Sequence, residues 1–116
     1  MLKATSHSEM AAPSPLAERL GPHTAFLAGL AGKYHWWLSP EEALDFPERI
    51  VALVMNVGEF RDTNRLAETV SDDCLRAVLQ QAEAGQFNAR SWHYWHYRLG
   101  LAEPSHVPPL PVRHIS

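Results

Sequence analysis

The run PERIVALVMNVG, from Pro47 to Gly58, constrains the fold of this chain more than any other stretch. Its apolar residues recur at spacings of three and four, which places four of them on one helical face: Ile50, Leu53, Val54 and Val57. Three more apolar residues widen this stripe: Val51, Ala52 and Met55. Proline begins the run and glycine ends it, as in many helices. We therefore expect a central helix, buried on more than one side.

Three further segments carry start and stop signals of helices. SPEE combines an N-cap serine, Ser39, with a proline and a glutamate that can complete a capping box. SDDCLRAVLQQAEAG has Ser71 as its expected N-cap and Gly85 as its end. NARSWHYWHYRLG begins with Asn88 as a cap and ends at Gly100. Each segment is long enough for at least one helical turn.

Other segments carry weaker signals. Asp45 can cap a second start, with Glu48 three residues later. PLAERL predicts a short turn of helix, and HTAFLAGLAGKYHWWL predicts either a short helix or an extended packed segment. EFRDTNRLAETV predicts a helix whose expected inner face is Phe60, Leu66, Ala67 and Val70.

Together these patterns predict an all-α fold, because no stretch alternates polar and apolar residues over a useful length. We expect a small bundle of about four or five short helices with extended tails. Residues 1–14, rich in Ser, Ala and Pro, predict a disordered tail; residues 15–101 predict the helical domain. Residues 102–116 contain many prolines and predict an extended tail, whose PPLPVR segment (Pro108 to Arg113) lies on its own domain or in a partner's groove.

The charge balance argues against nucleic acid as a partner. The net charge is −3 and no basic stripe is present, whereas phosphate attraction normally dominates nucleic-acid binding. One cysteine, Cys74, suits a reducing compartment and is expected in the core. The sequence has no apolar stretch long enough to predict a signal peptide or a membrane span. We therefore expect a cytoplasmic protein with no membrane partner.

The segment SWHYWHYRLG repeats a Trp-His-Tyr triplet. On a helix, one stripe forms from Trp92, Trp95, His96 and Leu99, and another from His93, Tyr97 and Gly100. We expect one of these stripes to fill the core, with Trp36 or Trp37 stacked against this helix. The other stripe must be covered by the chain's own ends or by a partner, which can be a second copy in a homodimer.

Metal binding is the alternative that the histidines raise. His93 and His96 have the i, i+3 spacing that can place two imidazoles near one ion, but zinc needs three or four ligands. The sequence has no HExxH motif, no paired cysteines and no Gly-rich phosphate loop. We therefore expect no catalytic residue, no metal and no cofactor. We expect His96 to be a packed, hydrogen-bonded residue and His93 to lie on the surface.

The stretch from about Trp37 to Leu101 resembles a family of small bacterial helical proteins of unsettled function. The resemblance depends on Leu44-Asp45, Val57-Gly58-Glu59, the segment from Leu66 to Leu79, and Tyr94-Trp95. Members of this kind are often encoded beside nucleotidyltransferase-like toxins of the abortive-infection type. The resemblance thus implies an antitoxin or accessory role, although His93 and His96 depart from the pattern.

The leading hypothesis is a non-enzymatic protein-binding module that neutralises a bacterial toxin by steric occlusion. The expected contact residues are an exposed part of the last helix and the tail: Trp92, His93, Tyr97, Arg98, Leu110 and Arg113. The alternative is a DNA-binding regulator with a helix-turn-helix near 63–81, although two aspartates begin its second helix. A third, weaker hypothesis is a metal-dependent enzyme that uses His93 and His96.

Overall fold

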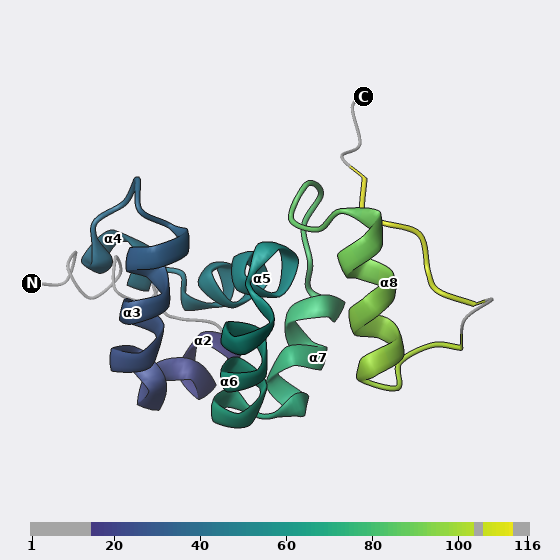
Figure 1. Cartoon of the computed structure of the whole chain (residues 1–116), viewed down its shortest axis with the longest axis horizontal. Coiled ribbons are helices and arrows are strands. Elements are labelled where there is room, and N and C mark those ends of the chain that lie inside the picture. Colours follow the sequence, from purple (N-terminus) through teal and green to yellow (C-terminus); the bar gives the residue numbers. More distant parts are fainter. Residues whose placement is uncertain (1–14, 104–105, 113–116) are drawn as a thin grey trace, which may run out of the picture.

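The chain forms short α-helices arranged around one central helix (Figure 1). The computed structural model describes residues 15–103 and 106–112, and within them all the regular structure is helical. The elements are α2 (Pro15–Leu20), the 3₁₀ turn η1 (Gly21–His23), α3 (Thr24–Tyr34), α4 (Pro40–Leu44), α5 (Pro47–Val57), α6 (Phe60–Val70), α7 (Asp72–Gln80) and α8 (Ala89–Arg98). The all-α prediction is confirmed, with more helices in the described part than the four or five expected.

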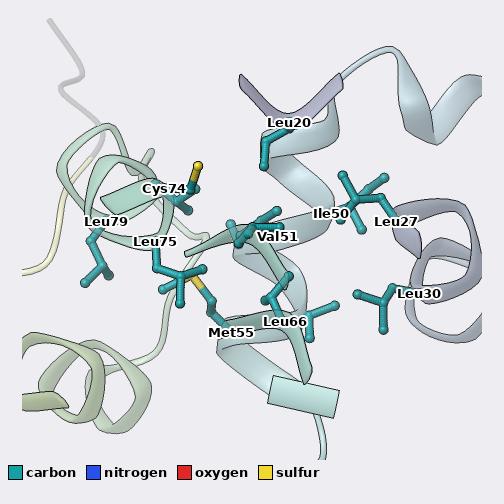
Figure 2. Close-up of a cluster of buried hydrophobic side chains, with 14 of the residues drawn as sticks. Leu20, Leu27, Leu30, Ile50, Val51, Met55, Leu66, Cys74, Leu75 and Leu79 are labelled. Carbon is teal, nitrogen blue, oxygen red and sulfur yellow. The ribbon is translucent and has the colours of Figure 1, made fainter. Parts of the chain in front are cut away.

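Helix α5 is the centre of the molecule, as its sequence predicts. Within the described residues, it packs against each of the other α-helices: α2, α3, α4, α6, α7 and α8. Figure 2 shows side chains of α2, α3, α6 and α7 converging on Val51 and Ile50 of α5. Burial of such apolar side chains is the main force that folds the chain.

The inner face of α5 is rotated from the predicted one. Ile50, Val51 and Val54 are fully buried, whereas Leu53 is only half-buried and Val57 is exposed. Because other helices pack on several sides of α5, its most buried side chains include Val51, one of the residues that widen the predicted apolar stripe. Leu53 and Val57 instead line grooves at the surface.

Two predicted caps are confirmed. The Ser39 hydroxyl accepts a hydrogen bond from the backbone N–H of Glu42, and the Glu42 carboxylate accepts one from the N–H of Ser39. This second bond holds the pKa of the Glu42 carboxyl below its usual value. At the start of α8, the Asn88 side chain accepts a hydrogen bond from the N–H of Ser91 at 2.8 Å. Both caps satisfy N–H groups that a helix leaves unpaired.

Of two other predicted caps, one is wrong and one is confirmed in position only. Asp45 belongs to the end of α4, because its N–H donates to carbonyls of that helix, and Phe46 occupies the cap position of α5. Ser71 lies between α6 and α7 at the predicted N-cap position of α7, but its side chain makes no capping hydrogen bond. Its backbone has φ of 79° and ψ of 155°, since this single residue both ends one helix and starts the next.

The junction of α5 and α6 has no room for a side chain at Gly58. A Cβ added there would lie 2.4 Å from the carbonyl oxygen of Val54 and 2.8 Å from a Val54 methyl group. Glycine therefore permits the tight turn between these helices. This turn places Phe60 at the first position of α6, where it is 74% exposed, so its predicted inward position is wrong.

A polar cluster joins α3 to the start of α6. The Lys33 ammonium donates to the Asp62 carboxylate at 2.8 Å and to the Glu59 carboxylate at 3.1 Å. The Tyr34 hydroxyl donates to Asp62 at 2.5 Å and accepts from the N–H of Glu59 at 2.9 Å. Burial and the neighbouring Asp62 raise the pKa of Tyr34, which keeps this phenol protonated. The cluster fixes the orientation of α6 on α3.

Helix α8 is anchored by side chains that satisfy carbonyls at helix ends. The Trp95 indole N–H donates to the Met55 carbonyl at 2.8 Å, and the Ser91 hydroxyl donates to the Asn56 carbonyl at 2.7 Å. At the far end, Arg76 of α7 donates to the Leu99 carbonyl at 3.0 Å. These bonds replace the intrahelical partners that last-turn carbonyls lack, and they hold α8 at a fixed place beside α5 and α7.

Candidate functional site

Helix α8 divides into a buried side and an exposed side. Trp92, Trp95, His96 and Leu99 are buried, so of the two predicted stripes this is the one that lies in the core. His96 is packed as expected, and its Nδ1–H donates to the Trp92 carbonyl at 2.7 Å. The prediction that Trp92 is exposed is wrong, because this side chain is only 4% exposed within the chain itself. Trp92 therefore does not belong to the outer surface of α8.

The outer face of α8 consists of His93, Tyr94, Tyr97 and Arg98, all of them exposed. Tyr94 and Tyr97 leave 45% and 43% of their surface accessible. The Arg98 guanidinium lies over the Trp95 ring, 4.9 Å from its centroid, and donates to the Tyr94 hydroxyl at 3.0 Å. These contacts hold the arginine in place before any partner arrives, which lowers the entropy cost of binding.

A groove adjoins this outer face. It has a volume of about 420 Å³ and lies between the α5–α6 junction and α8. Val57 and Phe60 stand on one side, and Arg90 and Tyr94 stand on the other. Since Tyr94 belongs to both the groove and the outer face, the two form one continuous surface with apolar, aromatic and cationic groups.

The charge of this surface is one-sided. Helix α8 carries two exposed arginines, Arg90 and Arg98, and contains no aspartate or glutamate. Uncompensated arginines beside aromatic rings suit a complementary surface that presents carboxylates and apolar side chains.

The proline-rich tail lies along its own domain in the part that the structure describes. The Trp92 indole N–H donates to the Pro108 carbonyl at 2.7 Å. Val107 and Leu110 are half-buried against the hydrophobic core. Leu110, a predicted partner contact, is therefore partly covered by the chain itself. Arg113, the other predicted tail contact, lies outside the described residues.

A second aromatic group lies far from α8, in the loop after α3. The predicted stacking of Trp36 or Trp37 on the last helix is wrong, because both side chains are largely exposed and their rings contact each other at 5.6 Å. Figure 1 shows α3 and α4 at one end of the molecule and α8 at the other, with α5 between them. Trp37 lines a separate groove of about 410 Å³ along α5.

The two histidines of the triplet have different surroundings. The Nδ1–H of His93 donates to the Ala89 carbonyl at the surface, whereas His96 is buried against the Trp92 ring. Across the described ranges 15–103 and 106–112, no three side chains of the types His, Cys, Asp and Glu gather as a metal site would require. Cys74 lies in the core, as expected.

Three contributors to the candidate surface were not predicted from the sequence. Tyr94 falls between the two stripes of α8, and Val57 and Phe60 were assigned to inner faces. Their exposure depends on the rotation of α5 and on the tight turn at Gly58, neither of which apolar periodicity reveals.

Comparison with known proteins gives no relative: no family model, no curated protein and no solved structure matches this chain. Within the described residues, no helix has both the length and the apolar character needed to cross a bilayer.

Proposed function

We propose that this chain is a non-enzymatic, protein-binding module. The observation that carries the proposal is the continuous surface of α8 and its groove, where Tyr94, Tyr97 and Arg98 adjoin Val57 and Phe60. Tyrosine and arginine are enriched among residues that dominate binding energy, and here the arginine is already held by two aromatic neighbours.

The charge of α8 supports a different protein as the partner, in preference to a second copy. Across a two-fold axis, the same patch meets itself, so the arginines of both copies would be brought together. Helix α8 has no carboxylate to offset this repulsion. A partner with an acidic, partly apolar patch fits better.

We further propose an antitoxin-like role in the cytoplasm, in which the bound module covers the working site of a bacterial toxin. The support is the resemblance of residues 37–101 to proteins encoded beside nucleotidyltransferase-like toxins. Steric occlusion needs only a rigid, complementary surface. Helix α8 supplies such a surface because its backbone is anchored at both ends.

The test is co-expression with the product of the adjacent gene, followed by size-exclusion chromatography and titration calorimetry. We expect a one-to-one complex, and we expect Tyr97→Ala and Arg98→Ala each to weaken binding by about 2 kcal/mol, roughly 30-fold. Trp36→Ala and Arg19→Ala are matched controls, since both residues are exposed and lie away from α8. Separate elution at micromolar concentration would contradict the proposal, as would equal losses from the control variants.

A DNA-binding role is the alternative that the same preparation tests. Helices α6 and α7 are joined by the single residue Ser71, which gives residues 63–81 a helix-turn-helix-like order. The exposed start of α7 carries Asp72 and Asp73, which would repel phosphates. The test is a mobility shift on the chain's own promoter at low salt. A shift that is lost when a residue of α7 away from these two aspartates is made acidic, as in Gln80→Glu, would favour this alternative over protein binding.

A further inference from the structure

The groove beside α8 presents two side-chain amides whose orientation is fixed. It is lined by α5, α6 and α8, with Gly58 and Asn88 at their ends. The Asn88 Oδ1 accepts from the N–H of Ser91 at 2.8 Å, and the Asn56 Oδ1 accepts from the N–H of Asn88 at 2.9 Å. A backbone N–H can only donate, so it is the oxygen of each amide that faces the backbone. The NH₂ group of each amide is left to donate to a ligand.

Helix α8 adds two further donors to this groove. The Tyr94 hydroxyl accepts from the Arg98 guanidinium at 3.0 Å, which leaves its own O–H to donate. The Arg90 guanidinium is exposed, and among the described residues it makes no ion pair. One wall of the groove therefore carries a positive charge and several hydrogen-bond donors.

No anionic side chain of the described residues competes for these donors. The groove has no aspartate or glutamate in its described lining. The two acidic residues at the start of α6, Glu59 and Asp62, are bound by the Lys33 ammonium of α3. Charged hydrogen bonds are stronger than neutral ones, and the planar fork of an arginine matches a carboxylate. The donor-rich wall thus favours a carboxylate as its ligand.

The opposite wall of the groove is apolar. Val57 and Phe60 line it, with 55% and 74% of their surfaces exposed. Covering this exposed apolar area with an apolar group of a ligand is favourable through the hydrophobic effect. The two walls together are complementary to a ligand that carries an apolar group next to a carboxylate.

We propose that this groove binds a segment of the partner protein in which a large apolar side chain is adjacent to an aspartate or glutamate. The carboxylate lies against Arg90 and the NH₂ groups of Asn56 and Asn88, and the apolar side chain lies against Val57 and Phe60. The inference rests on the proposed function and deepens it, because it names the chemistry by which the partner is recognised.

The experiment uses the full chain, labelled with ¹⁵N, and follows binding by nuclear magnetic resonance. The probe is the peptide Ala-Glu-Phe-Leu-Ala, acetylated and amidated so that the glutamate is its one charge. We expect saturable shifts of the side-chain NH₂ signals of Asn56 and Asn88. The dissociation constant should be on the order of 1 mM, because a short flexible peptide loses conformational entropy on binding. Peptides with glutamine for glutamate, or with alanine for both apolar residues, should bind at least about 10-fold more weakly.

Asn88→Asp separates ligand binding from folding. Aspartate keeps the oxygen that caps α8 and replaces only the NH₂ donor, by a carboxylate oxygen that repels the ligand. We expect an unchanged thermal midpoint and at least about 10-fold weaker peptide binding, and the same loss of binding from Arg90→Gln. Gln80→Glu is the matched control, since it makes the same chemical change at an exposed position of α7 outside the groove. It should bind the peptide like the unchanged chain.

Failure of this inference is distinguishable from failure of the proposed function. The inference is overturned if about 10 mM peptide, ten times the expected dissociation constant, shifts neither amide signal. It is also overturned if Asn88→Asp and Gln80→Glu bind the peptide equally well. Either result stands even where the adjacent gene product forms a complex that depends on Tyr97 and Arg98. Peptide binding that Asn88→Asp removes supports the inference even where that gene product elutes separately, and the partner is then a different protein.

Discussion

Asp62 lies nearly buried between α3 and α6, where its carboxylate accepts hydrogen bonds that join the two helices. Protonation of this carboxylate weakens these bonds. The Lys33 ammonium at 2.8 Å holds the pKa of this carboxyl below its usual value, and the Tyr34 hydroxyl acts in the same direction. The folded chain therefore prefers the ionised form more strongly than the unfolded chain does. This contribution to stability is present above the ordinary carboxyl pKa near 4, and it is lost as the pH falls through the lowered pKa.

We expect Asp62→Asn to lower the free energy of unfolding at pH 7 by about 1–2 kcal/mol, because charged hydrogen bonds from Lys33 and Tyr34 are lost. The difference from the unchanged chain should shrink between about pH 5 and pH 2, where the native carboxylate is itself protonated. Urea denaturation at several pH values measures both effects, with the exposed Asp45→Asn as control. A loss that stays constant with pH would mean that packing, and not charge, is what the substitution disturbs.

At the scale of elements, Ser71 is a single residue between two helices, in a backbone region that favours glycine. With φ of 79° and ψ of 155°, a residue with a Cβ is strained, at a cost of roughly 1–3 kcal/mol. The Ser71 side chain makes no capping bond that would offset this cost. We expect Ser71→Gly to raise the free energy of unfolding by about 1 kcal/mol. Thermal denaturation checks this.

Ser39→Gly is the matched control for that measurement. Ser39 has ordinary backbone angles and makes a capping bond to the N–H of Glu42, so its replacement should lower stability by a few tenths of a kcal/mol. Opposite signs for the two serine-to-glycine changes are therefore expected. The same sign for both would contradict the assignment of strain to Ser71.

The helices themselves were largely predictable, because caps and apolar periodicity act locally. Ser39 and Asn88 start helices for reasons visible within four residues of sequence. Asp45 was assigned wrongly, and Ser71 occupies its predicted cap position without the expected side-chain bond, because each lies in a link so short that two helices share it. The path of the chain in space then decides which residue ends one helix and which begins the next. The local sequence pattern holds no information about that path.

At the scale of the molecule, the candidate surface was predicted only in part. The division of α8 into a buried stripe and an exposed one follows from helical spacing, and His93, Tyr97 and Arg98 are exposed as expected. The position of Trp92 depends on a tail that returns from Pro108, sixteen residues later in the chain. The groove beside Tyr94 depends on α5 and α6, so no property of α8 alone could have indicated it.

Because α5 contacts every other described α-helix, these helices should unfold as one cooperative unit. Ile50→Val removes one fully buried methyl group from this centre and should cost about 1 kcal/mol. In a chain whose exposed Trp36 and Trp37 are replaced by Phe, fluorescence reports on Trp92 and Trp95 of α8, and far-ultraviolet circular dichroism reports on all helices. Both probes should give the same midpoint, shifted equally by Ile50→Val and unshifted by Val57→Ala at the exposed end of α5. If α8 melts earlier than the remainder, α5 does not transmit stability to it. The anchored helix required for partner binding would then be absent under those conditions.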